Sequence, residues 1–396
     1  LFNKNAFQNV VVNGIVLAED GKKMSKKLQN YPDPMEVVDK YGADALRLYL
    51  LSSPVMQAEN LAFAEKGVDE IARKNIGRLG NVLAFYQLYA DPIRNSSSSN
   101  GAGGTSRSNK SQNVLDRWIL ARLGQLIRES TQGFEKYQLD VATRPIAFFI
   151  DDLSAWYLRR SRERISAKGR SASGGKEGKQ QALATLRYVL HTLARVIAPS
   201  MPFFAERLYQ AVKEGNDPES VHLAEWPLTP HTGFFSGLFK KRDDGVLKAM
   251  ADARAIVTQA LEARDKAGIK VRQPLASLSI PTSSKLTDEY LSIIADEVNV
   301  KTVRKAGDDV VLDTKLSPDL ESEGFAREVV RAGQEKRKID KLNPSDRISR
   351  IIVTGSMNTI KAVHEHELTI QTTLKADVIE TKEDPNAEKP NISIER

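Results

Sequence analysis

The feature that most restricts the fold is a polar tract at residues 95–112, which reads NSSSSNGAGGTSRSNKSQ. Such a run of Ser, Gly and Asn has almost no apolar surface to bury, so it predicts a flexible linker or a disordered surface insertion. Folded domains must therefore lie on either side of it. With 396 residues, the chain has room for a first unit at residues 1–92, a linker at residues 93–113, and two further domains.

Helical periodicity dominates the stretch after the linker. Apolar residues recur on one helix face in four segments, with Pro145 suited to the first turn of the second and Pro199 ending the third. The predicted helices cover residues 115–127, 144–164, 180–198 and 202–212. Four helices with short or loose connections predict an antiparallel bundle at residues 114–230.

The pattern changes in the last part of the chain. Long helical patterns at residues 245–266 and 325–337 alternate with short apolar runs, and no solenoid-type repeat is evident. The short runs lie at residues 277–280, 298–303, 310–312 and 351–353. They predict a small α+β domain at residues 240–396.

The first unit begins with strand-like segments at residues 10–12 and 15–17, and Asp20 with Gly21 forms a turn signal that would reverse the chain. A helix should start at Asp33, which caps it, with Pro34 at its first position. Between the turn and the helix stand four lysines within six positions. They are Lys22, Lys23, Lys26 and Lys27.

Composition excludes several classes of site. Lys and Arg number 58 against 51 Asp and Glu, a net charge of +7 that is only a mild bias toward polyanions. No run reaches the roughly 18 apolar residues of a membrane helix. The absence of Cys excludes disulfides, thiolate zinc sites and cysteine catalysis within these residues. The five His are predicted to be structural or surface residues, at His191, His222, His231, His364 and His366.

The lysine run has two interpretations. It forms a solvated loop, or its ammonium groups close over a polyphosphate and neutralise charge that develops on a leaving pyrophosphate. The string Lys23-Met24-Ser25-Lys26-Lys27 closely resembles the KMSKS signature of class I aminoacyl-tRNA synthetases, with Lys27 in place of the last Ser. The strings LQNYPDP, YGADALRLYLLSSPV and AENLAF that follow resemble isoleucyl-tRNA synthetases in particular.

The resemblance implies a fold and a chemistry. The fold would be multidomain: the C-terminal end of an α/β Rossmann-like catalytic domain, an all-α anticodon-binding bundle and an α+β C-terminal domain. The reaction would join isoleucine to tRNA(Ile) with ATP and Mg²⁺. Lys26 would contact the ATP phosphates and Lys23 would assist, Met24 would anchor the loop, and Ser25 would add a hydroxyl or backbone contact.

Two further strings, LDRWILARL at residues 115–123 and WYLRRSRER at residues 156–164, resemble the anticodon-binding domain of this group. The residues that would contact tRNA are Trp156, Arg159, Arg160, Arg162 and Arg164. Two alternatives remain open: the arginines form a solvated helix end, and Trp156 belongs to the core.

The C-terminal region carries family-like strings as well. AGIKVRQPL at residues 267–275, NVKTV at residues 299–303 and EGFAREVVRAGQEKRK at residues 323–338 resemble isoleucyl enzymes. A second basic cluster is either a phosphate contact or a solvated face, with Arg327, Arg331 and Arg337 expected outside. The cluster is Lys336, Arg337, Lys338 and Lys341.

The family's His-rich ATP signature and its editing insertion do not occur in these residues. The sequence therefore predicts a fragment, inactive alone, of a cytoplasmic and monomeric enzyme without membrane association, and no zinc in this part of it. Valyl- and leucyl-tRNA synthetases remain alternatives. So does a non-catalytic tRNA-binding protein derived from a synthetase.

Overall fold

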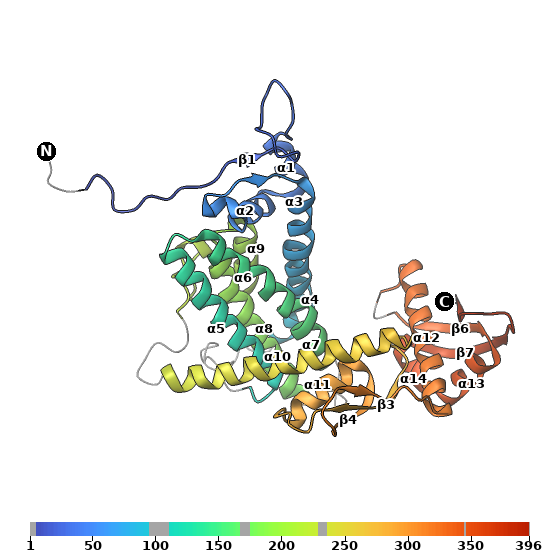
Figure 1. Cartoon of the computed structure of the whole chain (residues 1–396). Helices are drawn as coiled ribbons and strands as arrows, with labels where there is room; N and C mark the ends of the chain where they lie inside the picture. The colour runs from blue at the N-terminus through green and yellow to red at the C-terminus, as the bar shows by residue number, and fades with distance from the viewer. Residues whose placement is uncertain (1–4, 95–110, 167–174, 229–235, 344–345, 396) are drawn as a thin grey trace. The chain divides into compact units, whose positions relative to one another are not determined.

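The structure is a computed structural model that describes residues 5–94, 111–166, 175–228, 236–343 and 346–395. The chain divides into two compact units, Leu1–Leu247 and Lys248–Arg396 (Figure 1). The predicted linker falls largely on residues 95–110, outside the described residues. The predicted units at residues 1–92 and 114–230 lie in the same compact unit.

The first unit starts with small elements. A parallel strand pair forms its base, with Val16 opposite Leu61. The predicted strand at residues 10–12 is absent, and its valines are exposed. The elements are β1 (Val16–Leu17), α1 (Pro34–Tyr41), α2 (Ala43–Leu51), the 3-10 helix η1 (Pro54–Gln57), β2 (Leu61–Ala62), α3 (Glu65–Ile71), the π-helical η2 (Ala72–Gly77) and α4 (Arg78–Arg94).

Local sequence signals set the ends of α1. The Asp33 carboxylate accepts a hydrogen bond of 2.7 Å from the backbone N–H of Met35, and Pro34 opens the helix, as predicted. Gly42, with φ of 89°, separates α1 from α2. A small core under these helices contains Val37, Ala45, Phe63 and Val68.

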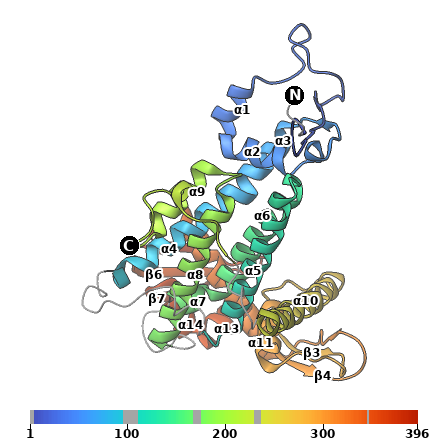
Figure 2. The same cartoon turned by 90° about the vertical axis from the view of Figure 1, so that its left-hand side faces the viewer.

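The bundle contains the four predicted helical segments, plus α4, which the sequence analysis did not assign. Figures 1 and 2 show α4, α5, α6 and α8 as long neighbouring helices. The segments are α5 (Val114–Glu135), α6 (Leu139–Asp151), the π-helical η5 (Asp152–Leu158), α7 (Arg159–Ser166), α8 (Gly175–Ile197), α9 (Pro202–Val212) and the 3-10 helix η6 (Val221–Leu223).

The second helical segment starts earlier than predicted, so Pro145 lies inside α6 rather than in its first turn. Close packing against α5 explains the extension. The Ser130 hydroxyl donates to the Ala142 carbonyl at 2.8 Å, and a Cβ on Gly133 would meet the Ala142 backbone nitrogen at 2.5 Å. Glycine at this position lets the two helix backbones approach.

Hydrogen bonds join the first elements to the bundle. Asp44 of α2 accepts from the backbone N–H of Phe204 at 2.6 Å and so caps α9. Burial raises the pKa of this carboxyl. Arg47 donates to the Pro199 carbonyl at 2.8 Å, and Arg144 donates to the Ser52 carbonyl at 2.8 Å. These contacts explain why the two predicted domains form one unit.

The second unit contains two three-stranded sheets, ordered β4-β3-β5 and β7-β6-β8. The sequence analysis found the long helices and several strands but missed α11, α13, α14, β7 and β8. The elements are α10 (Ser236–Lys266), β3 (Leu275–Ile280), α11 (Asp288–Val298), β4 (Val300–Lys305), β5 (Val311–Leu312), α12 (Pro318–Ile339), β6 (Ile348–Gly355), α13 (Met357–Glu365), α14 (Glu367–Leu374), β7 (Ala376–Glu383) and β8 (Asn391–Glu395).

Among the described residues, no helix combines the length and the apolar character needed to cross a bilayer.

Candidate functional site

A tight turn presents the lysine loop. The backbone N–H of Ala18 donates to the Lys22 carbonyl at 2.8 Å, and Gly21 has φ of 78°, which favours glycine. A single antiparallel bridge joins Leu17 to Lys23. The predicted turn at Asp20 and Gly21 is therefore confirmed, although the returning segment makes only this bridge rather than a full strand.

Asn30 holds the loop together. Its side chain accepts a hydrogen bond from the Ser25 N–H at 2.9 Å and donates to the Lys23 carbonyl at 3.2 Å. The Ser25 carbonyl in turn accepts from the N–H of Leu28 at 3.1 Å and of Gln29 at 3.0 Å. Sequence reasoning gave Asn30 no role. A side-chain amide just before a helix start, able to both donate and accept, was the available signal.

Met24 fixes the loop from the other side. Its side chain packs against the cluster of Val37, Ala45, Phe63 and Val68, which agrees with the expected anchoring role. The half-buried Met24 packs against the core while Lys23 and Lys26 on either side of it are exposed, so one short string contains both a packing residue and free charges.

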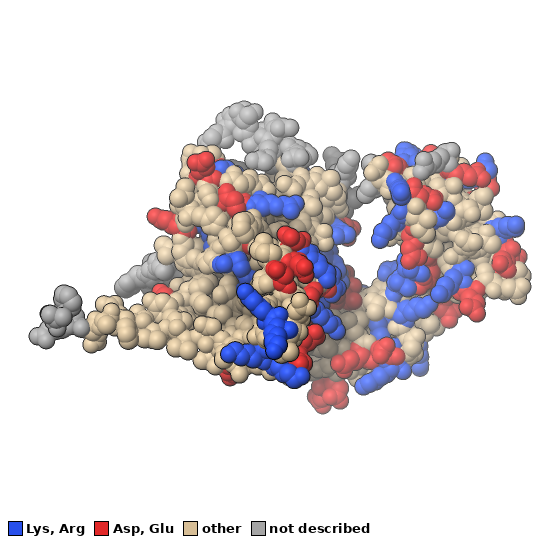
Figure 3. Space-filling view, turned by 90° about the horizontal axis from the view of Figure 1, so that it is seen from above, with Lys and Arg blue, Asp and Glu red and all other residues tan. Residues whose placement is uncertain are grey.

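The loop cations differ in their partners. Lys22 forms an exposed ion pair with Asp20 at 3.0 Å, and a hydrogen bond from the Lys22 backbone N–H lowers the pKa of Asp20. Lys23, Lys26 and Lys27 are exposed and have no carboxylate partner in the part of the chain that the structure describes. Seen from above, basic side chains gather on this end of the first unit beside acidic ones (Figure 3). The loop therefore presents three uncommitted ammonium groups on a fixed backbone.

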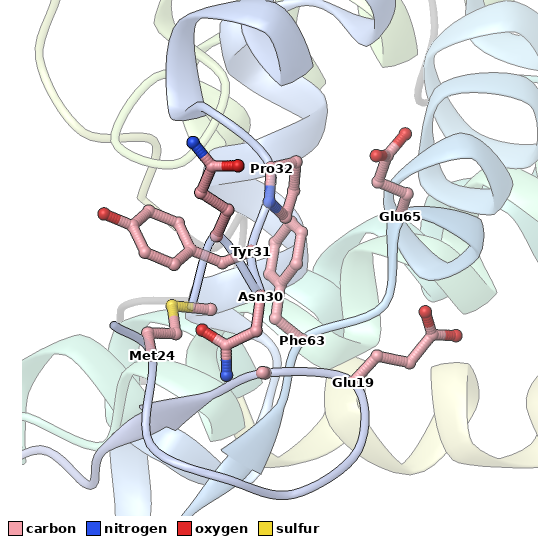
Figure 4. Close-up of a pocket in the computed structure, with 9 residues that line it drawn as sticks. Glu19, Met24, Asn30, Tyr31, Pro32, Phe63 and Glu65 are labelled. Carbon is pink, nitrogen blue, oxygen red and sulfur yellow. The ribbon is translucent and has the colours of Figure 1, made fainter. Parts of the chain in front are cut away.

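A cavity of about 370 Å³ lies beside the loop (Figure 4). Glu65, on its wall, accepts hydrogen bonds of 3.2 Å from Lys40 and from the Tyr41 hydroxyl, so its charge is already matched. The cavity is lined by Ala18, Glu19, Met24, Gln29, Asn30, Tyr31, Pro32, Phe63 and Glu65. None of the loop lysines is among the lining residues, and the exposed Glu19 adds a second carboxylate to the wall, so the loop cations lie beside this cavity rather than in it.

Arg164 requires a correction. It was predicted to contact tRNA, but the residue is only 5% exposed, and its guanidinium binds the Asp116 carboxylate at 2.5 and 3.0 Å. Burial disfavours the charge, but the hydrogen bond and the charge of Asp116 raise the pKa of Arg164 overall. A side chain committed inside the bundle does not reach a phosphate.

The Asp116 carboxylate is the centre of a buried polar network. Ser111 donates to it at 2.6 Å and the Tyr157 hydroxyl donates to it at 2.9 Å. Burial raises the pKa of Tyr157 well above 10.0. The network connects the strings LDRWILARL and WYLRRSRER, so these family-like strings join α5 to η5 and α7. Asp116 and Arg164, one charged residue from each string, are therefore structural.

The remaining predicted tRNA residues lie nearer the surface. Trp156 is half-buried, and the Arg159 guanidinium lies 5.9 Å from its ring centre. Arg162 is exposed and lies 5.5 Å from the ring centre of Phe85 on α4. Arg160 is half-buried.

A third aromatic residue, after Trp156 and Phe85, continues this row. Tyr89, whose ring lies 4.8 Å from Phe85, has the Lys179 ammonium 5.3 Å from its centre. Sequence reasoning missed Phe85, Tyr89 and Lys179 because α4 was not assigned to the bundle. The i, i+4 spacing of the two aromatics was the available signal.

The second basic cluster divides in a similar way. Arg337, expected outside, is buried, and it donates to the Leu374 carbonyl at 2.8 Å. Arg327 pairs with Glu323 at 2.6 Å. Arg331 pairs with Glu335 at 2.9 Å, and Lys336 with Asp340 at 2.9 Å. Arg337 is thus an interior residue, whereas Arg327, Arg331 and Lys336 form ion pairs along the helix that are partly or fully exposed.

The described part of the chain contains no group of three or more His, Cys, Asp or Glu side chains that could hold a metal ion. His191 is partly buried, stacks on Tyr209 and lies 3.0 Å from Asp217. Burial lowers its pKa. His231 lies outside the described residues.

Two family models match the chain. The model for class I tRNA synthetases (I, L, M and V) covers residues 1–62, and the anticodon-binding domain of tRNA ligase covers residues 116–280. Among solved structures, the ternary complex of Agrobacterium radiobacter K84 agnB2 LeuRS with tRNA and LeuAMS aligns over 55% of this chain and 23% of that chain, at TM-score 0.40 and 23% identity.

Curated relatives include the isoleucine–tRNA ligase of Chlamydia trachomatis serovar D, which is 42% identical over 307 residues, and that of Chlamydia caviae, 41% identical over 306 residues. Each alignment covers 76% of this chain and 28% of the relative, so the chain spans under a third of the length of these relatives. The chain belongs to the class I tRNA synthetases, and among them it is related to the isoleucine–tRNA ligases.

Proposed function

We propose that this chain is part of an isoleucine–tRNA ligase and supplies the loop that binds the ATP phosphates during activation of isoleucine. The single observation that carries this proposal is the state of Lys23 and Lys26. Both are exposed and lack a carboxylate partner among the described residues, while Asn30 and Met24 hold the backbone between them. A purely solvated loop would need neither restraint.

The chemistry follows from charge. The isoleucine carboxylate attacks the α-phosphorus of ATP, the bond from that phosphorus to the bridging oxygen breaks, and pyrophosphate leaves with its negative charge. Lys26 binds the leaving phosphates and Lys23 assists, which stabilises the charge as it develops. Mg²⁺ would share this task on the phosphate oxygens. The ribose hydroxyl of the terminal tRNA adenosine then takes the acyl group and releases AMP.

On the tRNA side, tRNA(Ile) would bind along a row of bundle residues. The row consists of Trp156, Arg159, Arg160 and Arg162. Guanidinium groups beside aromatic rings suit unstacked loop nucleotides, since cations bind phosphates and rings stack on bases. Phe85, Tyr89 and Lys179 extend the row. The enzyme would act in the cytoplasm as a monomer.

The test uses the full-length protein and isoleucine-dependent pyrophosphate exchange. Lys26→Ala should lower the exchange rate by a factor of about 100, the typical loss of one transition-state contact, with tRNA affinity nearly unchanged. Lys27→Ala is the matched control, because Lys27 is equally exposed on the same loop but is not assigned to ATP.

Equal losses in the two variants would refute the assignment of Lys26, and equal loss of tRNA binding would do the same. Comparison of isoleucine, valine and leucine tests the amino acid, and strongest exchange with valine or leucine would refute isoleucine. Absence of exchange with all three would favour a non-catalytic tRNA-binding protein.

A further inference from the structure

We infer that the second unit is an internal duplication: two copies of one helix–strand–helix–strand–strand module, each closed by an equivalent buried arginine. The first copy runs from α10 to β5, and the second from α12 to β8. Both small sheets are visible in Figure 1. The C-terminal strings at residues 267–275, 299–303 and 323–338 lie in this unit, and the proposed function gives them no role.

Topology and register repeat between the copies. The central strand pairs in parallel with the strand after the second helical segment and antiparallel with the last strand in both sheets. The first residue of the central strand, Leu275 or Ile348, lies opposite the first residue of the parallel strand, Val300 or Ala376. The antiparallel partners also correspond, because the fourth residue of each central strand pairs with the last strand.

The helix ends repeat at a constant spacing. Arg264 and Arg337 are 73 positions apart, and each lies two residues before the end of its long helix. In both copies the residue five positions later donates its N–H to the arginine carbonyl, at 3.0 and 2.9 Å. The residue four positions after each arginine, Gly268 or Lys341, has a positive φ of 67° or 53°.

The arginine side chains bind equivalent carbonyls. Arg264 donates to those of Lys270 and Gln273 at 3.1 and 3.0 Å. Arg337 donates to those of Asn343 and Asp346 at 2.7 and 3.0 Å, again 73 positions later.

Each arginine also reaches the end of the second helical segment. Arg264 binds the Val298 carbonyl, and Arg337 the Leu374 carbonyl, both at 2.8 Å. The residue after each of these carbonyls, Asn299 or Lys375, is in the left-handed conformation.

A buried guanidinium that binds only carbonyls is an uncommon arrangement, since buried charges are usually paired. Arg264 is 1% exposed, Arg337 is 9% exposed, and neither has a carboxylate partner among the described residues. Burial lowers the pKa of Arg264 to about 10. Two such arginines in the same place of the same topology indicate one module used twice rather than two unrelated solutions.

The long helices also share sequence at the same 73-residue spacing. Besides the two arginines, four pairs are identical: Ala253 and Ala326, Arg254 and Arg327, Val257 and Val330, and Glu262 and Glu335. Two further pairs, Ile256 with Val329 and Ala260 with Gly333, are similar and buried. The ten loop residues after each arginine, DKAGIKVRQP and KIDKLNPSDR, share almost no identity. The loops diverge because the arginine binds their backbone, and backbone carbonyls do not depend on side-chain identity.

The copies differ in one respect, which guides the experiment. In the first, the arginine-bound loop is covered by α12: Gln273 donates to the Leu320 carbonyl at 2.6 Å, and Arg272 pairs with Glu328 at 2.9 Å. In the second, Asp346 at the position of Gln273 accepts a hydrogen bond of 2.7 Å from the Asn343 N–H within its own loop. A loop exchange should therefore be made in the second copy, where the described side-chain ion pairs that are lost are those of Asp340 with Lys336 and of Arg347 with Asp377.

The first test measures amide hydrogen exchange on the full chain. Arg264→Met should lower protection by about tenfold or more at residues 268–273 and 298–300, and leave residues 341–343 and 374–376 unchanged. Arg337→Met should give the reverse pattern. The conservative Arg264→Lys and Arg337→Lys should each lie between wild type and Met. Loss of protection in both copies from either Met variant, or in neither, would overturn the equivalence.

The second test does not depend on the Met variants folding. Replacing residues 338–347 by the sequence of residues 265–274 should preserve the protection of β6 and β7, since the carbonyls that Arg337 binds keep their positions. The control deletes one residue from the same loop, which moves those carbonyls out of register and should remove the protection. An exchange variant as unprotected as the deletion variant would refute the proposal.

Discussion

The lysine loop and the Asp116 network contrast two uses of charge in one unit. In the loop, Lys23 and Lys26 are exposed and have no carboxylate partner among the described residues, while the backbone between them is restrained. In the network, Arg164 is buried and its charge is paired with that of Asp116. Both regions lie in family-like strings. A charged residue in such a string can therefore serve ligand binding or hold the fold together, and its burial in the structure distinguishes the two roles.

The largest effect should come from breaking the network. Asp116→Ala leaves Arg164 as an unpaired buried charge and should lower the free energy of unfolding by about 3–5 kcal/mol. All three tryptophans lie in the first unit, so urea unfolding followed by tryptophan fluorescence reports on that unit alone.

Asp69→Ala is the matched control. It removes an exposed pair with Arg73 and should cost under about 0.5 kcal/mol. Similar losses in the two variants would abolish the contrast between buried and exposed charge.

The loop restraint should have a smaller effect and act on rate. Asn30→Ala removes both hydrogen bonds that fix Lys23 and Ser25, and should lower pyrophosphate exchange of the full-length enzyme by about tenfold, the value of one to two such bonds. Leu28→Ala, an exposed change in the same loop, should leave exchange near wild type. If Asn30→Ala exchanges at the wild-type rate, the fixed backbone is irrelevant to the chemistry.

The exposed arginine offers a direct comparison with Arg164. Arg162→Gln should weaken tRNA binding and reduce the slope of log affinity against log salt by about one, without loss of stability. Glu163→Gln, at the adjacent exposed position, should not reduce that slope. An unchanged slope in Arg162→Gln would remove this residue from the tRNA surface.

The smallest effect concerns His191. Burial lowers its pKa in the folded protein below 6.5, so the unfolded chain binds the proton more tightly. Stability should therefore be complete above about pH 6.5 and fall as the pH drops through that value, by under about 1 kcal/mol.

His191→Gln should flatten this dependence between pH 7.5 and 5.5, whereas His222→Gln, at an exposed position of the same unit, should not. Urea midpoints at the two pH values measure both. A wild-type midpoint that rises on acidification would contradict the assignment.

Local signals predicted local structure well. Asp33 and Pro34 determine the start of α1, and Asp20 with Gly21 determines the turn, because these effects need only neighbouring residues. Helical periodicity located the bundle segments for the same reason. The start of α6 was misplaced because it depends on close packing against Gly133, a tertiary contact.

Charged residues were predicted less well. A sequence shows that Arg164 and Arg337 are cationic, but not that Asp116 or a set of loop carbonyls lies within reach. The sequence analysis also missed the duplication. Five identities repeat at a spacing of 73 residues between residues 253–264 and 326–337, but the ten residues that follow share none at this spacing, so the repeated sequence is confined to one short stretch of helix.

The cap that Asp44 places on α9 has a consequence for synthesis on the ribosome. Its partner, Phe204, follows 160 residues later. At about 5–20 residues per second, α2 leaves the ribosome roughly 8–30 s before the helix that it caps has been made. During that interval the Asp44 carboxylate remains hydrated and the face of α2 that packs on α9 is uncovered. The first unit therefore completes its fold only after most of its chain has been translated, and until then α2 lacks one of its packing partners.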